Sequence, residues 1–309
     1  MYGAIIGDIV GSIYEFCNIK TKDFPLFSPN CEFTDDSIMS LAVAKAIILS
    51  CQKENRTNGK GFQDILVNEM QGYGRRFPNP MGAYGNRFLY WLFAEHPQPY
   101  GSYGNGSAMR VSACGLAAVS LEEAVALGRA SAAVTHDHPE GIKGAEAVAV
   151  AIYLAKIGKT KEEIKEYIQN NYYNLDFTLD EIRPIYRFDP SCQGTVPQAL
   201  VAFFESNSFE DAIRNMISIG GDSDTAGAIT GSVAWIYYLG YENWCKRQYP
   251  APMLALKQQA MQYLTQEFVD LEEAFAKVCV QRAAEYARTG TCTPILNQAE
   301  LETYGKNFI

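Results

Sequence analysis

The chain lacks the cysteine and histidine patterns of common zinc and redox sites. Its 8 cysteines are scattered, with no Cys-x-x-Cys pair, and it has only 3 histidines. We therefore predict neither a cysteine zinc site nor a redox dithiol. The N-terminal stretch 1–16 has no basic start and is interrupted by glycines and Asp8, so we predict no secretory signal peptide. The simplest expectation is a cytoplasmic protein with reduced thiols.

An excess of basic residues is also missing, since 26 Lys and Arg face 35 Asp and Glu, for a net charge of −9. A chain with this charge does not attract polyanions through its overall field, which argues against nucleic acid as a partner. Any phosphate that it binds must be held locally, by backbone amides or by metal ions. No uninterrupted apolar run reaches the length of a membrane span, so we predict no membrane association.

Strand-like alternation is absent as well. Apolar residues recur at three- and four-residue spacing over most of the chain, which predicts helices. Ser120 before "LEEAVALGRA" and Thr160 before "KEEIKEYI" are helix start signals. No linker-like segment divides the chain, so we predict a compact all-α bundle in a single domain over residues 1–309, and a monomer. The predicted helices are 36–51, 62–71, 84–94, 107–119, 121–134, 140–156, 161–170, 196–206, 209–218, 225–239, 251–268 and 271–287.

Two acidic motifs, "FTDDS" at 33–37 and "GGDSDT" at 220–225, each stand directly before an apolar helix. Either motif alone is explained by helix capping, because carboxylates at a helix start accept free N–H groups and offset the dipole. Adjacent acids such as Asp35 and Asp36 point about 100° apart around a helix, so both cannot cap the same end. A cluster of acids without partners is unfavourable. Asp and Thr oxygens suit Mg²⁺ or Mn²⁺, so the two helix starts could hold metal ions between them.

The joint presence and order of these motifs resemble the ADP-ribosylglycohydrolase family. This family includes ADP-ribosylarginine and ADP-ribosylserine hydrolases and the nitrogenase-reductase-activating glycohydrolase. The resemblance covers about three quarters of the chain, and the last seventy or so residues carry no motif that we can assign. The stretches that carry it are "GAIIGDIVGSIYEF" at 3–16, "FTDDS" at 33–37, "GRRFPNPMGAYGNRFLYWL" at 74–92, "GSYGNGSAMRV" at 101–111, "THDHPEG" at 135–141 and "GGDSDTAGAITGSVA" at 220–234.

The resemblance implies an all-α fold with a central binuclear metal site that holds two divalent cations, Mg²⁺ or alternatively Mn²⁺. It also implies that Glu15 lies at this site and contributes to catalysis, either as a ligand or by handling a water molecule. By itself, a glutamate between Tyr14 and Phe16 is more typical of a solvated helix end. The metal ligands implied by the resemblance are Thr34, Asp35, Asp36, Asp222, Asp224 and Thr225.

The glycine-rich stretch "GSYGNGSAMR" precedes a predicted helix, where exposed N–H groups favour phosphate, although such clusters also form plain turns. The resemblance implies that Ser102, Gly104, Asn105 and Gly106 contact the diphosphate of ADP-ribose, with Tyr103 as a candidate to stack on the adenine. It places His136 near the phosphates. We expect His138 and His96 to be structural, with a cap as the simplest role for a histidine before Pro139.

The implied function is metal-dependent hydrolysis of the glycosidic bond that joins ADP-ribose to an acceptor, with ADP-ribose and an ADP-ribosylated protein as partners. The acceptor could be an arginine or serine side chain, a small ester or a nucleobase. We expect loops 17–32 and 172–192 to decide among them. Two alternatives are a metal-dependent phosphoesterase or pyrophosphatase that cuts the diphosphate, and a non-catalytic ADP-ribose binder. Every acid of the pattern is present, which disfavours the binder.

Overall fold

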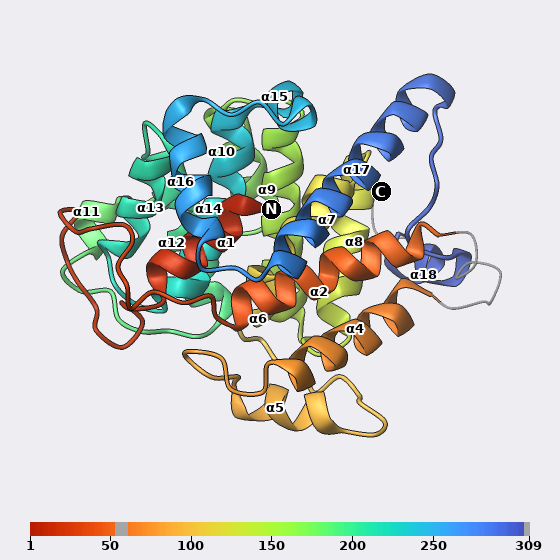
Figure 1. The fold of residues 1–309 in the computed structure, drawn as a ribbon, viewed down its shortest axis with the longest axis horizontal. Helices are drawn as coiled ribbons and strands as arrows, with labels where there is room; N and C mark the ends of the chain where they lie inside the picture. The colour runs from red at the N-terminus through yellow and green to blue at the C-terminus, as the bar shows by residue number, and fades with distance from the viewer. Residues whose placement is uncertain (53–60, 306–309) are drawn as a thin grey trace.

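The computed structural model describes residues 1–52 and 61–305, and within these ranges it contains helices and no strands. The prediction of an all-α single-domain fold is therefore confirmed. The helices shown in Figure 1 are α1 (Tyr2–Gly11), α2 (Asp35–Ser50), α4 (Phe62–Arg76), α5 (Asn86–Phe93), α6 (Gly106–Met109), α7 (Ser112–Ala117), α8 (Leu121–Ala133), α9 (Pro139–Lys156), α10 (Lys161–Asn171), α11 (Leu179–Ile182), α12 (Cys192–Phe204), α13 (Phe209–Ile217), α14 (Ser223–Leu239), α15 (Tyr241–Lys246), α16 (Ala251–Met261), α17 (Gln266–Thr289) and α18 (Gln298–Tyr304).

Helix α1 is not among the predicted helices, because its glycines and Asp8 break the apolar periodicity, and the short helices α11, α15 and α18 are not among them either. All its residues are buried, and it packs against α14 at the middle of the molecule, with other helices around the pair (Figure 1). The approach is close because glycines face each other: a Cβ on Gly7 would lie 1.9 Å from the carbonyl oxygen of Gly227. A Cβ on Gly3 would lie 2.1 Å from that of Gly231. Only glycine permits this backbone-to-backbone contact.

The predicted single helix 251–268 is wrong, because the chain turns between α16 and α17. The side chain of Thr265 accepts a hydrogen bond from the N–H of Phe268 and caps α17, so a new helix begins there. The predicted helix 107–119 is likewise split, into α6 and α7, which meet at Arg110 and Val111. Pro197 falls in the first turns of α12, which begins at Cys192 and not at residue 196.

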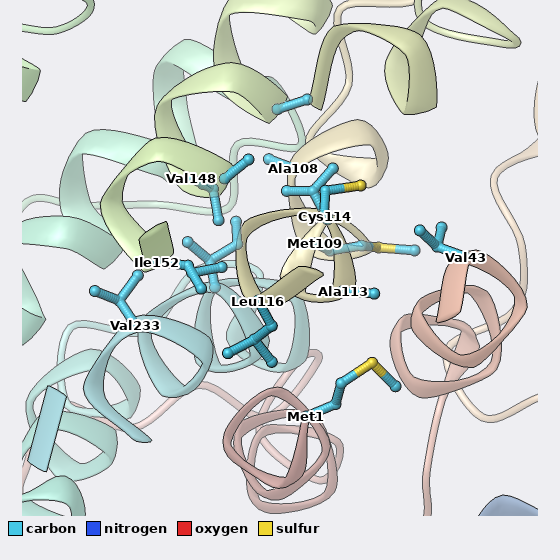
Figure 2. Packing of buried hydrophobic residues seen from close by; sticks show 14 of the residues in the cluster. Met1, Val43, Ala108, Met109, Ala113, Cys114, Leu116, Val148, Ile152 and Val233 are labelled. Atoms are coloured by element: carbon cyan, nitrogen blue, oxygen red, sulfur yellow. The ribbon is translucent and has the colours of Figure 1, made fainter. Parts of the chain in front are cut away.

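The hydrophobic core joins α1, α2, α7, α9 and α14. Figure 2 shows Leu116 of α7 between Met1 and Ile152, and Val233 of α14 beside Ile152. Many core residues are alanines and valines, and these small side chains let the helices lie close together. Among the described residues no helix is both long and apolar enough to cross a membrane.

The C-terminal region, in which the sequence shows no motif, packs against the rest of the bundle through hydrogen bonds made by α17 and α18. Arg282 of α17 is buried and donates to the carbonyl of Thr293 at 2.9 Å and to Glu123 at 2.6 Å. Glu300 of α18 accepts from the backbone N–H groups of Phe62 and Gln63 at 3.1 and 2.8 Å. These contacts satisfy the free N–H groups at the start of α4, where a carboxylate is favoured.

Candidate active site

The two acidic motifs meet at the starts of α2 and α14. Thr34 caps α2, with its side chain accepting from the N–H of Asp36 at 3.2 Å. The hydroxyl of Thr225 donates to Asp36 Oδ2, also at 3.2 Å, which joins the two motifs directly. The starts of the two helices therefore face each other, although 189 residues separate these two side chains in the sequence.

Asp8 of α1 is a member of this centre that the sequence reading did not select. It is fully buried and accepts hydrogen bonds from the N–H and hydroxyl of Thr34, at 3.0 and 2.7 Å, and from the N–H and hydroxyl of Ser37. Burial raises its pKa to about 6, and these hydrogen bonds limit the rise. The available signal was a single acid inside an apolar stretch, which is costly unless it has partners.

The carboxylates form two groups that share Asp224. Asp8, Asp36 and Asp224 each offer an oxygen within 4.8 Å of the others, and so do Glu15, Asp222 and Asp224. The structure thus brings Glu15, from the segment after α1, to the same centre as both helix starts. Asp35 lies beside them and is partly exposed to the adjoining cavity.

These groups fit divalent cations on the chemistry of their oxygens. Within the described part of the chain, Glu15 Oε2, Asp36 Oδ1 and Asp224 Oδ1 are buried and have no hydrogen-bond partner. Burial, followed by repulsion from Asp222 and Asp8, raises the pKa of Glu15 to about 8. Burial and neighbouring acids also raise the pKa values of Asp36 and Asp224 far above their usual range. Cations would remove both penalties, and acids and hydroxyls are the ligands that Mg²⁺ and Mn²⁺ prefer.

A cavity of about 470 Å³ connects the acidic centre to the glycine-rich loop. Thr34, Asp36 and Tyr103 are the predicted site residues that do not line it. The predicted residues that do are Glu15, Asp35, Ser102, Gly104, Asn105, Gly106, His136, Asp222, Asp224 and Thr225.

Asn105 links the loop to the acidic centre. Its side-chain amide donates to Asp222 Oδ2 at 2.8 Å and to the hydroxyl of Thr195 at 3.0 Å. The hydroxyl of Ser102 accepts from the N–H of Gly104 at 3.2 Å. The helix that follows, α6, is a single turn of 4 residues, so its dipole is small and the N–H groups of the loop matter more than the helix does.

His136 is buried and lines the cavity beside this loop. Burial lowers its pKa well below the usual range, and the positive charge of Arg110 lowers it further. Arg110 donates to the hydroxyl of Thr135 at 2.8 Å, and that hydroxyl lies 2.6 Å from His136 Nδ1. The Thr135 hydroxyl, which accepts from Arg110, still has its own hydrogen to donate to Nδ1, and we assign it this role. This assignment places the proton of the neutral ring on Nε2, which lies close to Gly104 and Gly106, 3.5 and 3.4 Å from where a Cβ on each would stand.

Tyr103 lies apart from the cavity lining. Half of its surface is exposed, and its ring lies 5.2 Å from that of His138. His138 caps α9 by accepting from the N–H of Glu140 at 3.1 Å, as expected for a structural histidine. The sequence reading did not select Arg87, which lines the cavity with its guanidinium 4.8 Å from the ring of Tyr100.

The expected specificity loops contribute few residues to the cavity. Loop 172–192 supplies Phe188 and Pro190, while loop 17–32 supplies none and is represented only by its neighbour Phe16. A segment from Gly82 to Phe88, which runs from the loop after α4 into the start of α5, lines the cavity instead. Gly82 has φ +80°, and a Cβ there would lie 2.7 Å from Glu15 Oε2. This residue must therefore be glycine for the segment to lie so close to Glu15.

The fold and the site define a class: an all-helical protein in which two groups of acidic side chains, suited to divalent cations, lie beside one cavity. The chain belongs to the ADP-ribosylglycohydrolase family, whose model matches residues 1–284. It is a hydrolase of this family, and the family acts on ADP-ribose conjugates.

Individual relatives are distant. The chain is 24% identical over 302 residues to ADP-ribosylhydrolase ARH3 of Homo sapiens, covering 76% of this chain and 83% of that protein. It is 24% identical over 273 residues to ADP-ribosylarginine hydrolase Tri1 of Serratia proteamaculans, covering 79% and 71%. An uncharacterised protein of Archaeoglobus fulgidus is 31% identical over 264 residues, covering 75% and 84%. A solved ADP-ribosylglycohydrolase-related protein complex shares the fold, with a TM-score of 0.63 and 21% identity over 92% of this chain and 95% of that one.

Proposed function

We propose that this enzyme hydrolyses the bond between the anomeric carbon of ADP-ribose and an acceptor, and releases intact ADP-ribose. The observation that carries the proposal is the 2.8 Å hydrogen bond between Asn105 and Asp222. This bond places the loop suited to the diphosphate next to the acidic centre within one cavity. A substrate with its diphosphate on the loop would then present its ribose, and not a phosphorus atom, to the acids.

The side chains divide the work between binding and chemistry. The N–H groups of the 102–106 loop and the Nε2–H of His136 would hold the diphosphate oxygens. The metal ligands already named, with Asp8 as a further one, would hold two divalent cations, Mg²⁺ or Mn²⁺. Such cations would offset the carboxylate charge and would supply a binding site for the ribose hydroxyls. Glu15 Oε2 has no partner and lines the cavity, so it is the atom that we assign to accept a proton from the attacking water or to bind a cation. Tyr103 remains our candidate for the adenine, with its half-exposed ring beside the loop.

The acceptor that we favour is a protein arginine side chain. Phe16 and Phe188, which are 72% and 46% exposed, line the cavity together with Glu15 and Asp35. Aromatic faces and carboxylates together suit a planar cation such as guanidinium. A serine or ester acceptor would leave this combination unused.

The experiment is a screen of defined conjugates, ADP-ribosyl-arginine and ADP-ribosyl-serine peptides, with and without Mg²⁺, read by mass spectrometry. Release of ADP-ribose, faster from the arginine peptide, is the expected result. Release of AMP would identify a pyrophosphatase and refute the proposal. Tight binding of ADP-ribose without turnover of any conjugate would identify a binder.

A further inference from the structure

Asn18 connects the segment that carries Glu15 to the segment that carries Asp222. Its side-chain nitrogen donates to the carbonyls of Tyr14 at 2.7 Å, Glu15 at 2.9 Å and Gly221 at 2.9 Å. Its side-chain oxygen accepts from the N–H of Gly221 at 2.7 Å. The amide therefore pairs with both backbone groups of Gly221 and also binds the chain at Glu15. Asn18 itself is exposed, so these bonds are not a by-product of burial in the core.

The partner segment is shaped to receive this side chain. Gly220 and Gly221 have φ values of +70° and +88°, a region that favours glycine. A Cβ on Gly220 would lie 2.9 Å from Asn18 Oδ1, and one on Gly221 would lie 2.4 Å from the ring of Tyr186. The double glycine that precedes Asp222 is thus required by contacts with Asn18 on one side and with loop 172–192 on the other.

A second residue of the same loop strengthens the connection. Lys20 donates to the carbonyl of Tyr186 at 2.9 Å and to the carbonyl of Ile219. Loops 17–32 and 172–192 are therefore bonded to each other and to the backbone that leads into Asp222.

We propose that Asn18 is a positioning residue, which fixes Glu15 relative to Asp222 so that their carboxylates can share a cation. The proposal rests on the proposed function for its link to catalysis, but its first consequence is an effect on metal affinity. Removing a residue that orients metal ligands lowers metal affinity or activity by about 10- to 100-fold.

Two substitutions test it. Asn18→Ala removes all four hydrogen bonds. Asn18→Asp keeps the shape and the acceptor for Gly221 N–H but sets a carboxylate oxygen against three carbonyl oxygens. Its added negative charge would by itself favour a cation, so a loss of affinity in this variant reports the lost positioning. Asn171→Asp is the matched control, because Asn171 is exposed and donates to the carbonyl four residues before it, Tyr167, at 2.8 Å, as Asn18 does to Tyr14.

The readouts are the Mn²⁺ dissociation constant by titration calorimetry, the melting temperature without metal, and ADP-ribose release. We expect Mn²⁺ affinity to fall at least tenfold in both Asn18 variants and less than twofold in the control, with similar metal-free melting temperatures in all three. Mn²⁺ affinities of both Asn18 variants within twofold of wild type would overturn the proposal, and so would a wild-type protein that binds no Mn²⁺. A wild type that binds Mn²⁺ but releases no ADP-ribose would refute the proposed function alone, because the affinity comparison would still decide the role of Asn18.

Discussion

Substituting Gly7 by alanine should destabilise the protein strongly, although the same change usually stabilises a helix. Alanine is favoured over glycine in a helix interior by about 1 kcal/mol. At Gly7, however, the new Cβ would lie 1.9 Å from Gly227 O and 2.2 Å from its carbonyl carbon. Ordinary contact begins at 3.4 Å, so α1 and α14 would have to separate locally by about 1.5 Å, the difference between 3.4 and 1.9 Å.

The obstacle is backbone on a buried helix, which cannot rotate away as a side chain can. Overpacked sites cost about 1–3 kcal/mol, and a gap of even 0.5–1 Å forfeits about a quarter to a half of a contact's dispersion energy. The separation would affect the whole buried length of α1, so we expect a cost above the upper end of this range and a net loss of about 3 kcal/mol after the helix-propensity gain. With a urea slope of about 3 kcal/mol per M, the unfolding midpoint should fall by about 1 M.

Gly72→Ala is the matched control, because Gly72 lies in α4 and its added Cβ would meet nothing within 4 Å. Its midpoint should stay level or rise. The assay is urea unfolding followed by circular dichroism, in the presence of a chelator so that metal binding does not contribute. A Gly7→Ala midpoint equal to or above that of wild type would refute the reasoning, because the close contact between α1 and α14 would then not constrain the fold.

Three further outcomes are expected. Asp36→Asn should melt at or above the wild-type temperature in chelator, since it relieves repulsion among buried acids. Mg²⁺ should stabilise only the wild type, raising its free energy of unfolding by about 2.7 kcal/mol at 100 times the dissociation constant; an equal Mg²⁺ response would count against the metal centre. Glu15→Ala should lower the single-turnover rate by about 10²–10⁴-fold and leave the affinity for ADP-ribose little changed. Ser102→Ala should mainly weaken ADP-ribose binding, as measured by calorimetry. Equal losses of affinity in the two variants would contradict the assignment of Glu15 to chemistry and of Ser102 to binding. Burial lowers the pKa of Lys156 from 10.5 to about 8. As pH falls, Lys156 takes up its proton in the unfolded chain before it does so in the folded protein, which stabilises the unfolded state. The free energy of unfolding of wild type minus that of Lys156→Met should therefore drop by about 3 kcal/mol from pH 10.5 to 8 and then stay level. A difference that does not change with pH in urea titrations would exclude the pKa shift.

The sequence alone predicted the helical class and drew attention to most of the residues that line the candidate site, because both readings depend on local patterns. Apolar spacing and start signals such as Thr160 act within one or two turns, so they are readable without tertiary information. The paired acids of "FTDDS" and "GGDSDT" exceeded what capping requires, and that excess predicted the acidic centre. The family resemblance then placed the acids, Glu15 and the glycine loop together, and in the structure they lie around one cavity.

Only the tertiary structure decided what depends on neighbours distant in the chain. Helix α1 has no amphipathic pattern because every face of it is buried, and its glycines serve a partner more than 200 residues away. Asp8 is tolerated in the core only because Thr34 and Ser37 donate hydrogen bonds to it. The sequence around Asp8 does not indicate that these two residues are its partners. The pairing of Asn18 with Gly221 likewise spans 203 residues. A residue's own sequence neighbourhood records its backbone preference and its charge, whereas the partners that make a buried acid or an interior glycine favourable are set by how the helices pack.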